Sequence, residues 1–363
     1  MGENFKKILH VTFNITQKMR IFQVITLSEL GGAQSVVTSL ANEIAKTDEV
    51  FVIAGGNGAM WDALSPSIRK ISIPQLKRSI SLLDIIVWIK LVYYYIKYKP
   101  DIINLHSSKI GLLGRLAFPR KKTFYTVHGF DSIRVAYRKF LPLEKMLSKR
   151  AHIIAVSDYD ANNIHLEGIK GDVECIYNGI ADMTESSKKT HTKELLCDTG
   201  FKVLCVARLA APKRFDIFVE TAKLLPDIKF FWVGNQNDIE NLPENVFCLG
   251  QVPNAAYLNT QADVFMLSSN FEGMPISIIE ALCCGKPVVA SAVGSIPDIL
   301  KHNNGYAVEN NPQAFADKIK LLYTNKNLYD KMSLSARESY EKYFTLDIMK
   351  SHYVSVYKKY AKK

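Results

Sequence analysis

The chain has 363 residues, a hydrophobic content of 48% and a formal net charge of +11 at pH 7. Such a length and apolar content are enough to bury two hydrophobic cores, so they exclude a disordered chain and favour two domains over one. The six cysteines lack the paired C-x-x-C spacing of a zinc site, which favours reduced, buried thiols.

The positive charge is concentrated in the first half of the chain. Residues 1–181 contain 24 Lys and Arg against 15 Asp and Glu, an excess of +9, whereas residues 182–363 contain 22 against 20, an excess of +2. Two interpretations stay open. The first half either faces an anionic partner, such as lipid head groups, a phosphorylated acceptor or nucleic acid, or simply has a basic surface.

Residues 1–18 form a predicted N-terminal extension. They contain a short apolar run but no long apolar segment and no small-residue cleavage site, so the pattern does not favour a secretion signal. Met19 opens the first β-like stretch, so we expect the first domain to begin there and the extension to be poorly ordered.

Between residues 19 and 181, short β-branched runs alternate with helix-like segments. This alternation predicts a parallel sheet with helices on both faces. The predicted strands are 21–26, 50–54, 101–105, 123–127 and 152–156.

A Gly-Gly pair follows the first predicted strand. Gly31 and Gly32 would let the backbone approach a phosphate or a sugar closely, and the helix that begins at Ala33 would present its N-terminus there. A simple tight turn explains the pair equally well. The chain has no G-x-G-x-x-G fingerprint of a dinucleotide site.

The segment from Ile80 to Tyr95 is the longest apolar stretch. Asp84 and Lys90 interrupt it, and it is too short to cross a bilayer. Its aromatic residues, followed by lysines, would also suit a helix that lies at a membrane interface. We favour an ordinary helix packed on the sheet and leave the interfacial helix open.

Two histidines directly follow predicted strands. His106 follows 101–105, and His128 follows 123–127. Because ligands bind at the carboxyl edge of an open parallel sheet, we expect both side chains to face a cleft. A packed histidine at a strand end is the alternative.

The polar stretch 182–193 has no apolar period and is a predicted linker. The alternating pattern then resumes, which predicts a second Rossmann-like domain over residues 194–345. Its predicted strands are 203–207, 229–233, 246–249, 264–268 and 287–291, followed by helices that end with 346–360.

Arg208 and Lys213 follow the first strand of this second half. Fixed cations at that edge would stabilise negative charge on a ligand bound there. Solvated surface charges are the alternative.

The strongest local pattern follows the strand 264–268. Pro275 suits the first position of a helix and Gly285 the position just past its end, which predicts a helix over 275–284. The backbone N–H groups of Gly273, Met274 and the first helical turn would then face the ligand edge, where a helix N-terminus favours a phosphate.

The carboxylates of Glu272 and Glu280 flank this predicted phosphate site. They would repel a phosphate, but they suit the hydroxyl groups of a sugar and a ribose. The pattern therefore indicates a nucleotide sugar.

Glu272 and Glu280 are separated by seven residues, and this E-x7-E spacing resembles family 4 glycosyltransferases, retaining enzymes of the kind that builds bacterial surface polysaccharides. The resemblance implies an α/β protein of the GT-B fold, in which two Rossmann-like domains face each other across a cleft. It implies that domain 19–181, joined by a C-terminal helix over 346–363 that crosses back to it, binds the acceptor. Domain 194–345 would bind the nucleotide sugar.

The resemblance also implies roles for single residues. The first Glu of the motif contacts the donor hexose, the second holds the ribose hydroxyls, the basic pair holds the diphosphate, and the histidine contacts the donor sugar near the reacting bond. We assign catalysis to His128, Glu272, Arg208 and Lys213, and place His106 on the acceptor side. Donor binding is assigned to Gly31, Gly32, Arg208, Lys213, Glu272, Gly273, Met274, Pro275 and Glu280. The family usually carries an acid where Gln34 stands, so the role of that position is open.

We therefore expect a retaining glycosyltransferase that moves a hexose or an N-acetylhexosamine from a nucleotide sugar, with UDP as the expected base, to a glycan or lipid-linked glycan. A nucleotide-sugar epimerase of the same fold and a non-catalytic partner subunit stay open as alternatives. The basic pair and the helix N-terminus already supply the charge that a metal ion would give, so we expect neither a cofactor nor a required metal.

The expected location is the cytoplasm, with peripheral attachment to the anionic inner face of the cell membrane through the basic first half. No recognition motif supports a nucleic-acid partner.

Overall fold

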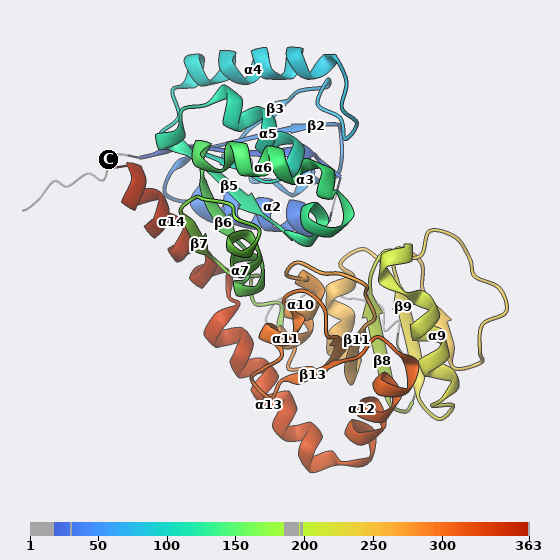
Figure 1. Cartoon of the computed structure of the whole chain (residues 1–363). Helices are drawn as coiled ribbons and strands as arrows, with labels where there is room; N and C mark the ends of the chain where they lie inside the picture. The colour runs from blue at the N-terminus through green and yellow to red at the C-terminus, as the bar shows by residue number, and fades with distance from the viewer. Residues whose placement is uncertain (1–17, 30, 185–195, 197–198, 362–363) are drawn as a thin grey trace, which may run out of the picture.

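The computed structural model describes residues 18–29, 31–184, 196 and 199–361. The predicted N-terminal extension lies outside the described residues except for Lys18, and so does the predicted linker from residue 185 onward. The described chain forms two α/β units, each built on one parallel sheet (Figure 1).

The first unit contains a seven-stranded sheet in the order β3-β2-β1-β4-β5-β6-β7, and every neighbouring pair is parallel. Its central strands are short runs of buried, mostly apolar residues, as expected for a parallel sheet that is covered on both faces. The strands are β1 (Arg20–Leu27), β2 (Glu49–Gly55), β3 (Arg69–Ser72), β4 (Ile102–Leu105), β5 (Thr123–Val127), β6 (His152–Ala155) and β7 (Val173–Cys175).

The helices of this unit cover the two faces of the sheet and enclose two separate apolar clusters. One face is covered by α2 (Gly32–Ile44), α3 (Met60–Ala63) and the C-terminal α14 (Leu346–Ala361). The other face is covered by α4 (Leu83–Tyr98), α5 (Ser108–Ala117), α6 (Leu141–Leu147) and α7 (Asp158–Leu166). Short helical turns join them: η1 (Arg120–Lys122), η2 (Ser132–Ala136), η3 (Arg138–Phe140) and η4 (Ser148–Arg150).

The second unit contains a six-stranded parallel sheet in the order β10-β9-β8-β11-β12-β13 around one continuous apolar cluster. Its strands are β8 (Lys202–Val206), β9 (Lys229–Val233), β10 (Val246–Cys248), β11 (Val264–Leu267), β12 (Val288–Ser291) and β13 (Gly305–Val308). Its helices are η5 (Ala211–Lys213), α9 (Phe215–Lys223), η6 (Ala255–Gln261), α10 (Ile276–Cys283), α11 (Ile296–Ile299), α12 (Pro312–Thr324) and α13 (Lys326–Tyr343).

The chain passes between the units at two places that lie side by side. The Ile180 N–H donates to the carbonyl of Phe344 at 3.0 Å, and the Leu346 N–H donates to the carbonyl of Ile180 at 2.8 Å. Beyond this point α14 returns to the first unit, where Tyr353 and Tyr357 are fully buried (Figure 1). The predicted return of the C-terminal helix is thus seen in the structure.

The predicted strands are all present, whereas β3, β7 and β13 were not predicted. These three are edge strands of three or four residues, and each has at least two residues that are not fully buried. A short edge strand lacks the continuous apolar run by which a central parallel strand is recognised, so the sequence gives little sign of it.

Helix α4 packs on the sheet, as the sequence favoured, because Val87 and Leu91 belong to the apolar cluster on this face. It buries only Val87 and Leu91, and its outer face carries exposed large apolar side chains. Leu82 just before the helix is 86% exposed, and Ile85 and Ile96 on it are 61% and 64% exposed. Among the described residues, no helix is both long and apolar enough to span a bilayer.

Candidate functional site

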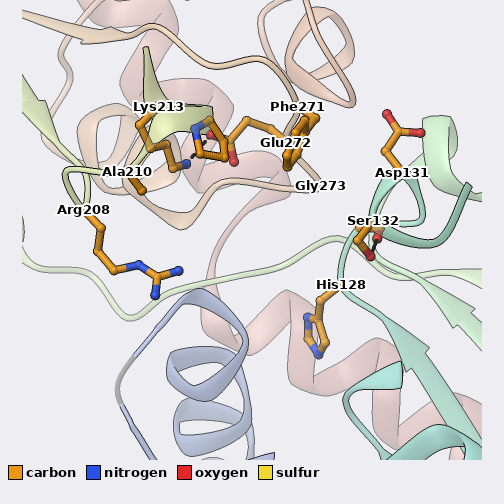
Figure 2. Close-up of a pocket in the computed structure, with 11 residues that line it drawn as sticks. His128, Asp131, Ser132, Arg208, Ala210, Lys213, Phe271, Glu272 and Gly273 are labelled. Carbon is orange, nitrogen blue, oxygen red and sulfur yellow. Dashed lines mark hydrogen bonds and ion pairs between the residues drawn. The ribbon is translucent and has the colours of Figure 1, made fainter. Parts of the chain in front are cut away.

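A cavity of about 280 Å³ lies between the two units, beyond the carboxyl ends of β5, β8 and β11. Strand ends from both sheets therefore meet at one site, as expected for ligand binding by open parallel sheets. The lining residues are His128, Gly129, Asp131 and Ser132 from the first unit, and Arg208, Ala210, Pro212, Lys213, Phe271, Glu272 and Gly273 from the second (Figure 2).

Opposite charges lie together on the second-unit wall. Lys213, at the end of η5, forms an ion pair with Glu272 in the loop after β11. The same carboxylate oxygen accepts a hydrogen bond of 2.7 Å from Ser269 Oγ, and Ser268 Oγ donates to the Arg214 carbonyl at 3.0 Å. Because Ser268 ties the end of β11 to the loop after β8 and Ser269 fixes Glu272, the two charges are held side by side.

Arg208 adds a second positive charge to this wall. It follows β8 and is exposed, and among the described residues its guanidinium has no hydrogen bond or ion pair. Figure 2 shows this side chain pointing into the space between the two units. A free guanidinium next to Lys213 can take up the charge of a diphosphate without first losing a protein partner.

The two units touch directly at glycines. A Cβ atom on Gly273 would lie 2.6 Å from the carbonyl oxygen of His128 and 2.8 Å from the Cα of Gly129. Gly129 has a φ of +132°, in the region that favours glycine. Within the second unit, a Cβ on Gly294 would lie 1.8 Å from the carbonyl oxygen of Glu272, so the Glu272 loop also packs against a glycine. The close approach of the units at the cavity thus depends on residues without side chains.

On the first-unit wall, the half-buried His128 is joined to the buried His106. His128 Nε2 is 3.0 Å from His106 Nδ1, and His106 Nε2 is 2.6 Å from Gln23 Oε1. Burial lowers the pKa of His128 to about 4, and burial together with the neighbouring His128 lowers the pKa of His106 well below its usual range. Both rings are therefore uncharged at neutral pH.

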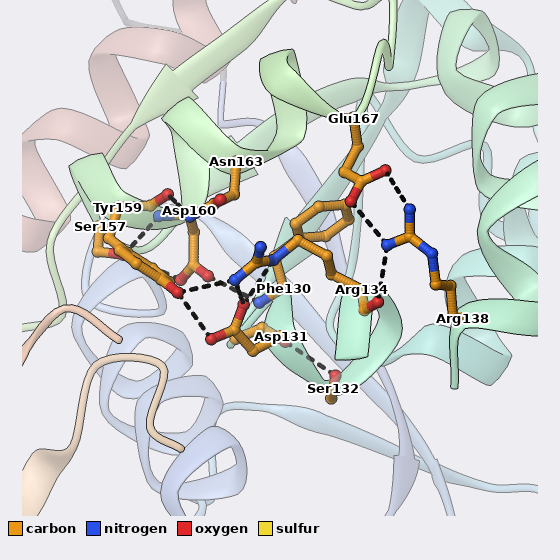
Figure 3. Close-up of polar contacts among 11 residues, drawn as sticks. Phe130, Asp131, Ser132, Arg134, Arg138, Ser157, Tyr159, Asp160, Asn163 and Glu167 are labelled. Atoms are coloured by element: carbon orange, nitrogen blue, oxygen red, sulfur yellow. Dashed lines mark hydrogen bonds and ion pairs between the residues drawn. The ribbon is translucent and has the colours of Figure 1, made fainter. Parts of the chain in front are cut away.

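The segment after His128 is held by a second polar network (Figure 3). Asp131 pairs with Arg134 at 2.8 Å and accepts a hydrogen bond of 2.9 Å from the Tyr159 hydroxyl. Asp160 accepts from the Phe130 N–H at 2.7 Å, and burial raises the pKa of this carboxyl to about 6. Both oxygens of Asp131 are engaged, so this carboxylate lines the cavity in a fixed orientation.

Helix α10 begins one residue later than predicted. Pro275 is its N-cap, and the last helical residue is Cys283. Met274 points away from the cavity, because its Sδ accepts the Asn178 N–H at 3.0 Å. Glu280 lies on α10, has no hydrogen-bond or ion-pair partner among the described residues, and has its pKa raised by burial to about 7.

Several predicted site residues do not line the cavity. Gly31 and Gly32 lie at the start of α2, and a Cβ on Gly32 would meet no atom within 4 Å. His106 is 1% exposed and lies behind His128 instead of on an acceptor-facing surface. The predicted residues that line the cavity together are His128, Arg208, Lys213, Glu272 and Gly273.

The sequence interpretation missed Asp131 and Ser132 from the first unit and Phe271 from the second. Their positions carried a usable signal, since each lies within four residues of a predicted strand end or site residue. Among the described residues, no group of three or more His, Cys, Asp or Glu side chains is arranged to hold a metal ion.

Two family profiles together span most of the chain. Residues 30–182 match the family described as Glycosyltransferase Family 4, and residues 186–339 match the one described as Glycosyl transferases group 1. The boundary between the two matches falls in the segment that joins the two sheets.

Similar proteins include two enzymes from Escherichia coli. The UDP-Gal:alpha-D-GlcNAc-diphosphoundecaprenol alpha-1,3-galactosyltransferase is 29% identical over 335 residues, which cover 81% of this chain and 85% of that protein. The O-antigen biosynthesis glycosyltransferase WbnH is 27% identical over 328 residues, which cover 86% of this chain and 93% of that protein.

Solved structures share the whole architecture. A glycosyltransferase from Rickettsia africae superposes with a TM-score of 0.78 at 21% identity, covering 96% of this chain and all of that one. HepE from Anabaena, solved with UDP and glucose, superposes with a TM-score of 0.79 at 20% identity. The match covers 93% of this chain and 99% of that one. These likenesses show the fold. With both halves matched by family profiles, the chain belongs to the family 4-like glycosyltransferases of the GT-B fold.

Proposed function

We propose that this glycosyltransferase moves a hexose or an N-acetylhexosamine from a UDP-sugar to a glycan or lipid-linked glycan, with retention of the anomeric configuration. The observation that carries the proposal is the cavity in which Arg208, Lys213 and Glu272 face His128. The names of the relatives support its terms, since one uses UDP-Gal and a diphosphoundecaprenol acceptor and another serves O-antigen biosynthesis.

Each charged group has a part in donor binding. Arg208 and Lys213 take the diphosphate, so Lys213 exchanges part of its contact with Glu272 for the phosphate. Glu272, no longer fully paired, accepts hydrogen bonds from hydroxyls of the sugar. Glu280 accepts the ribose hydroxyls from α10, the helix whose N-terminal side faces the diphosphate.

Retention is proposed to occur by substitution on one face of the sugar. A double displacement needs a free carboxylate close to the anomeric carbon. Of the two carboxylates in the cavity wall, Asp131 is engaged by Arg134 and Tyr159, and Glu272 is assigned to binding the hydroxyls of the sugar. The departing diphosphate, with its charge stabilised by Arg208 and Lys213, instead accepts the proton of the acceptor hydroxyl. The two cations supply the charge stabilisation that a metal ion would otherwise give, so we propose that no metal is required.

The direct test is a transfer assay with a panel of UDP-hexoses and UDP-N-acetylhexosamines and a diphosphate-lipid-linked sugar as acceptor. A product whose new linkage has the same anomeric configuration as the donor, measured by NMR, supports the proposal. Epimerisation of a donor incubated alone would instead support the nucleotide-sugar epimerase. Stabilisation of the protein by a donor without any turnover would support the non-catalytic subunit.

We also propose that the enzyme attaches peripherally to the cytoplasmic face of an anionic membrane through α4. Six exposed apolar side chains of this segment lie at spacings of three and four, so they share one face of the helix. Exposed lysines and an arginine flank both ends and are suited to anionic head groups. The apolar residues are Leu82, Ile85, Ile86, Ile89, Tyr93 and Ile96, and the basic ones are Lys77, Arg78, Lys97 and Lys99.

Flotation with vesicles tests this attachment. The double substitution Ile85→Glu and Ile89→Glu is expected to abolish flotation with phosphatidylglycerol vesicles but leave transfer to a water-soluble acceptor unchanged. The control Leu334→Glu places the same charge at an equally exposed apolar site on α13 and should leave flotation intact. Equal flotation of both variants and the parent protein, or no flotation of the parent protein, would contradict the proposal.

A further inference from the structure

A chain of buried polar side chains connects His128 to the C-terminal helix. From His128 it passes through His106 to Gln23 Oε1, with distances of 3.0 and 2.6 Å. Gln23 Nε2 donates to the Tyr357 hydroxyl at 3.4 Å, and Asn104 Nδ2 donates to the same hydroxyl at 2.8 Å. The chain therefore joins the cavity to α14, a helix more than 200 residues away in sequence.

These side chains lie within an apolar layer. Gln23, Asn104 and Tyr357 are fully buried, and they occupy the sheet face that α2 and α14 cover. Polar groups in such a place cost free energy unless each one is hydrogen-bonded, and apolar residues of similar size are often as stable or more stable. A gain in stability therefore does not explain why these positions carry polar residues. Their connection to the cavity does.

The acceptor Gln23 Oε1 sets the position of the protons on both histidines. Gln23 Oε1 carries no hydrogen, so His106 Nε2 must donate to it. A neutral imidazole has a single N–H, so His106 Nδ1 is an acceptor, and His128 Nε2 must donate to it. The proton of His128 is thus on Nε2, and its Nδ1 carries a lone pair.

The remaining nitrogen of His128 is available to a ligand. Among the described residues, His128 Nδ1 makes no hydrogen bond. The atom is also not enclosed by the protein. Because His128 lines the cavity, this lone pair can accept a hydrogen bond from a hydroxyl group bound there.

We propose that His106, held by Gln23 and Tyr357, is a positioning residue that keeps His128 in the Nε2–H tautomer, so that His128 Nδ1 accepts a hydrogen bond from a hydroxyl of the bound sugar. The inference rests on the proposed function in that a sugar occupies the cavity. In the opposite tautomer His128 would present an N–H, and the same hydroxyl would lose its acceptor. An orienting group of this kind acts on the chemical step without touching the substrate.

The first test reads the tautomer directly and needs no activity. Long-range proton–nitrogen NMR of the histidine rings, with His128 assigned by its loss in His128→Ala, is expected to show a protonated Nε2 and a bare Nδ1. His106→Leu is expected to convert His128 to a mixture of tautomers. A proton on Nδ1 of His128 in the unsubstituted protein would overturn the proposal.

The second test is kinetic and uses isosteres. His106→Asn keeps an amide group near the place of Nδ1 and so retains an acceptor for His128, whereas His106→Leu keeps none. We expect His106→Leu to lower kcat by about 10- to 100-fold at nearly unchanged donor KM, and His106→Asn to restore much of the loss. If both variants fold and lose activity equally, the link to His128 is wrong.

Tyr357→Phe tests the far end of the chain. It removes the hydroxyl that orients Gln23, and we expect kcat to fall less than in His106→Leu, together with partial loss of the single tautomer. Tyr125→Phe is the matched control, because it deletes a buried hydroxyl on the opposite face of the same sheet. Equal effects of the two substitutions would count against the proposal. An absence of transfer in the unsubstituted protein would refute the proposed function, and the NMR result would still decide the tautomer.

Discussion

The two walls of the cavity are built by opposite means. The second-unit wall presents the charges of Arg208, Lys213 and Glu272 on loops after β8 and β11, and Arg208 is exposed. The first-unit wall presents a neutral, half-buried histidine backed by polar groups within the sheet, beside an Asp131 carboxylate that is paired with Arg134. Charge on the donor wall suits a diphosphate, whose negative charge grows during transfer. A neutral ring on the opposite wall suits hydroxyl groups, because their hydrogen bonds depend on the orientation of the acceptor more than on its charge.

The largest expected effect comes from the charged wall. Lys213→Ala leaves Glu272 without its counter-ion and the diphosphate without a cation, so we expect kcat to fall by about 100- to 1,000-fold and donor affinity to fall as well. The control Lys223→Ala removes an exposed lysine of the same unit that pairs with Glu220. Steady-state kinetics and donor titration by thermal unfolding measure both quantities. Unchanged donor turnover in Lys213→Ala would refute the assignment of this wall.

The second largest effect is expected from the contact between the two walls at Gly273. In Gly273→Ala the new Cβ would lie within 3 Å of the His128 carbonyl and the Gly129 Cα, so the two units have to move apart. A misplacement of about 1 Å at a reacting centre costs about 100-fold in rate. We expect a loss of that order in kcat with donor binding largely kept, because the charged groups proposed to hold the diphosphate all lie in the second unit. Wild-type kcat in this variant would show that transfer does not need the contact.

A smaller, pH-dependent effect is expected from Glu280. Its raised pKa of about 7 means that the carboxyl becomes protonated as the pH falls below 7, so the donor KM should rise on acidification. The same shift makes the folded protein bind more protons than the unfolded one between the usual pKa of 4.5 and about 7, so stability falls as the pH rises through that range.

Glu280→Gln should therefore raise Tm at pH 8 and weaken donor binding at that pH by about tenfold. It should also remove the acid-side rise in KM. Donor KM between pH 5.5 and pH 8, together with thermal unfolding at both ends, checks these outcomes. The same pH profile in Glu280→Gln as in the parent protein would assign the titration to another group.

Removal of metal ions is expected to have no effect on activity. If Arg208 and Lys213 supply the charge for the departing diphosphate, dialysis against EDTA should leave kcat unchanged, and added magnesium or manganese should not raise it. Loss of activity on chelation, recovered by one of these ions, would show that the two cations do not suffice.

Much of this protein follows from local sequence. Buried apolar strands such as β5 and β9 were predicted to the residue, because parallel strands covered on both faces need continuous β-branched and aromatic runs. The loop around Glu272 and the start of α10 were also predicted, because glycine and proline mark chain turns through backbone geometry. Short edge strands such as β3 and β13 carry no such pattern.

The assembly of the site was decided by tertiary structure. Sequence position placed His106 and His128 at equivalent strand ends, yet only one of them lines the cavity, and the other lies behind it on Gln23 and Tyr357. It placed Gly31 in the site, whereas Gly31, at the N-cap of α2, is not among the residues that line this cavity. Local patterns determine strands, turns and helix ends because these depend on near neighbours. Which side chains share a cavity or a hydrogen bond depends on how distant strands and α14 pack, and that packing is set by the whole core.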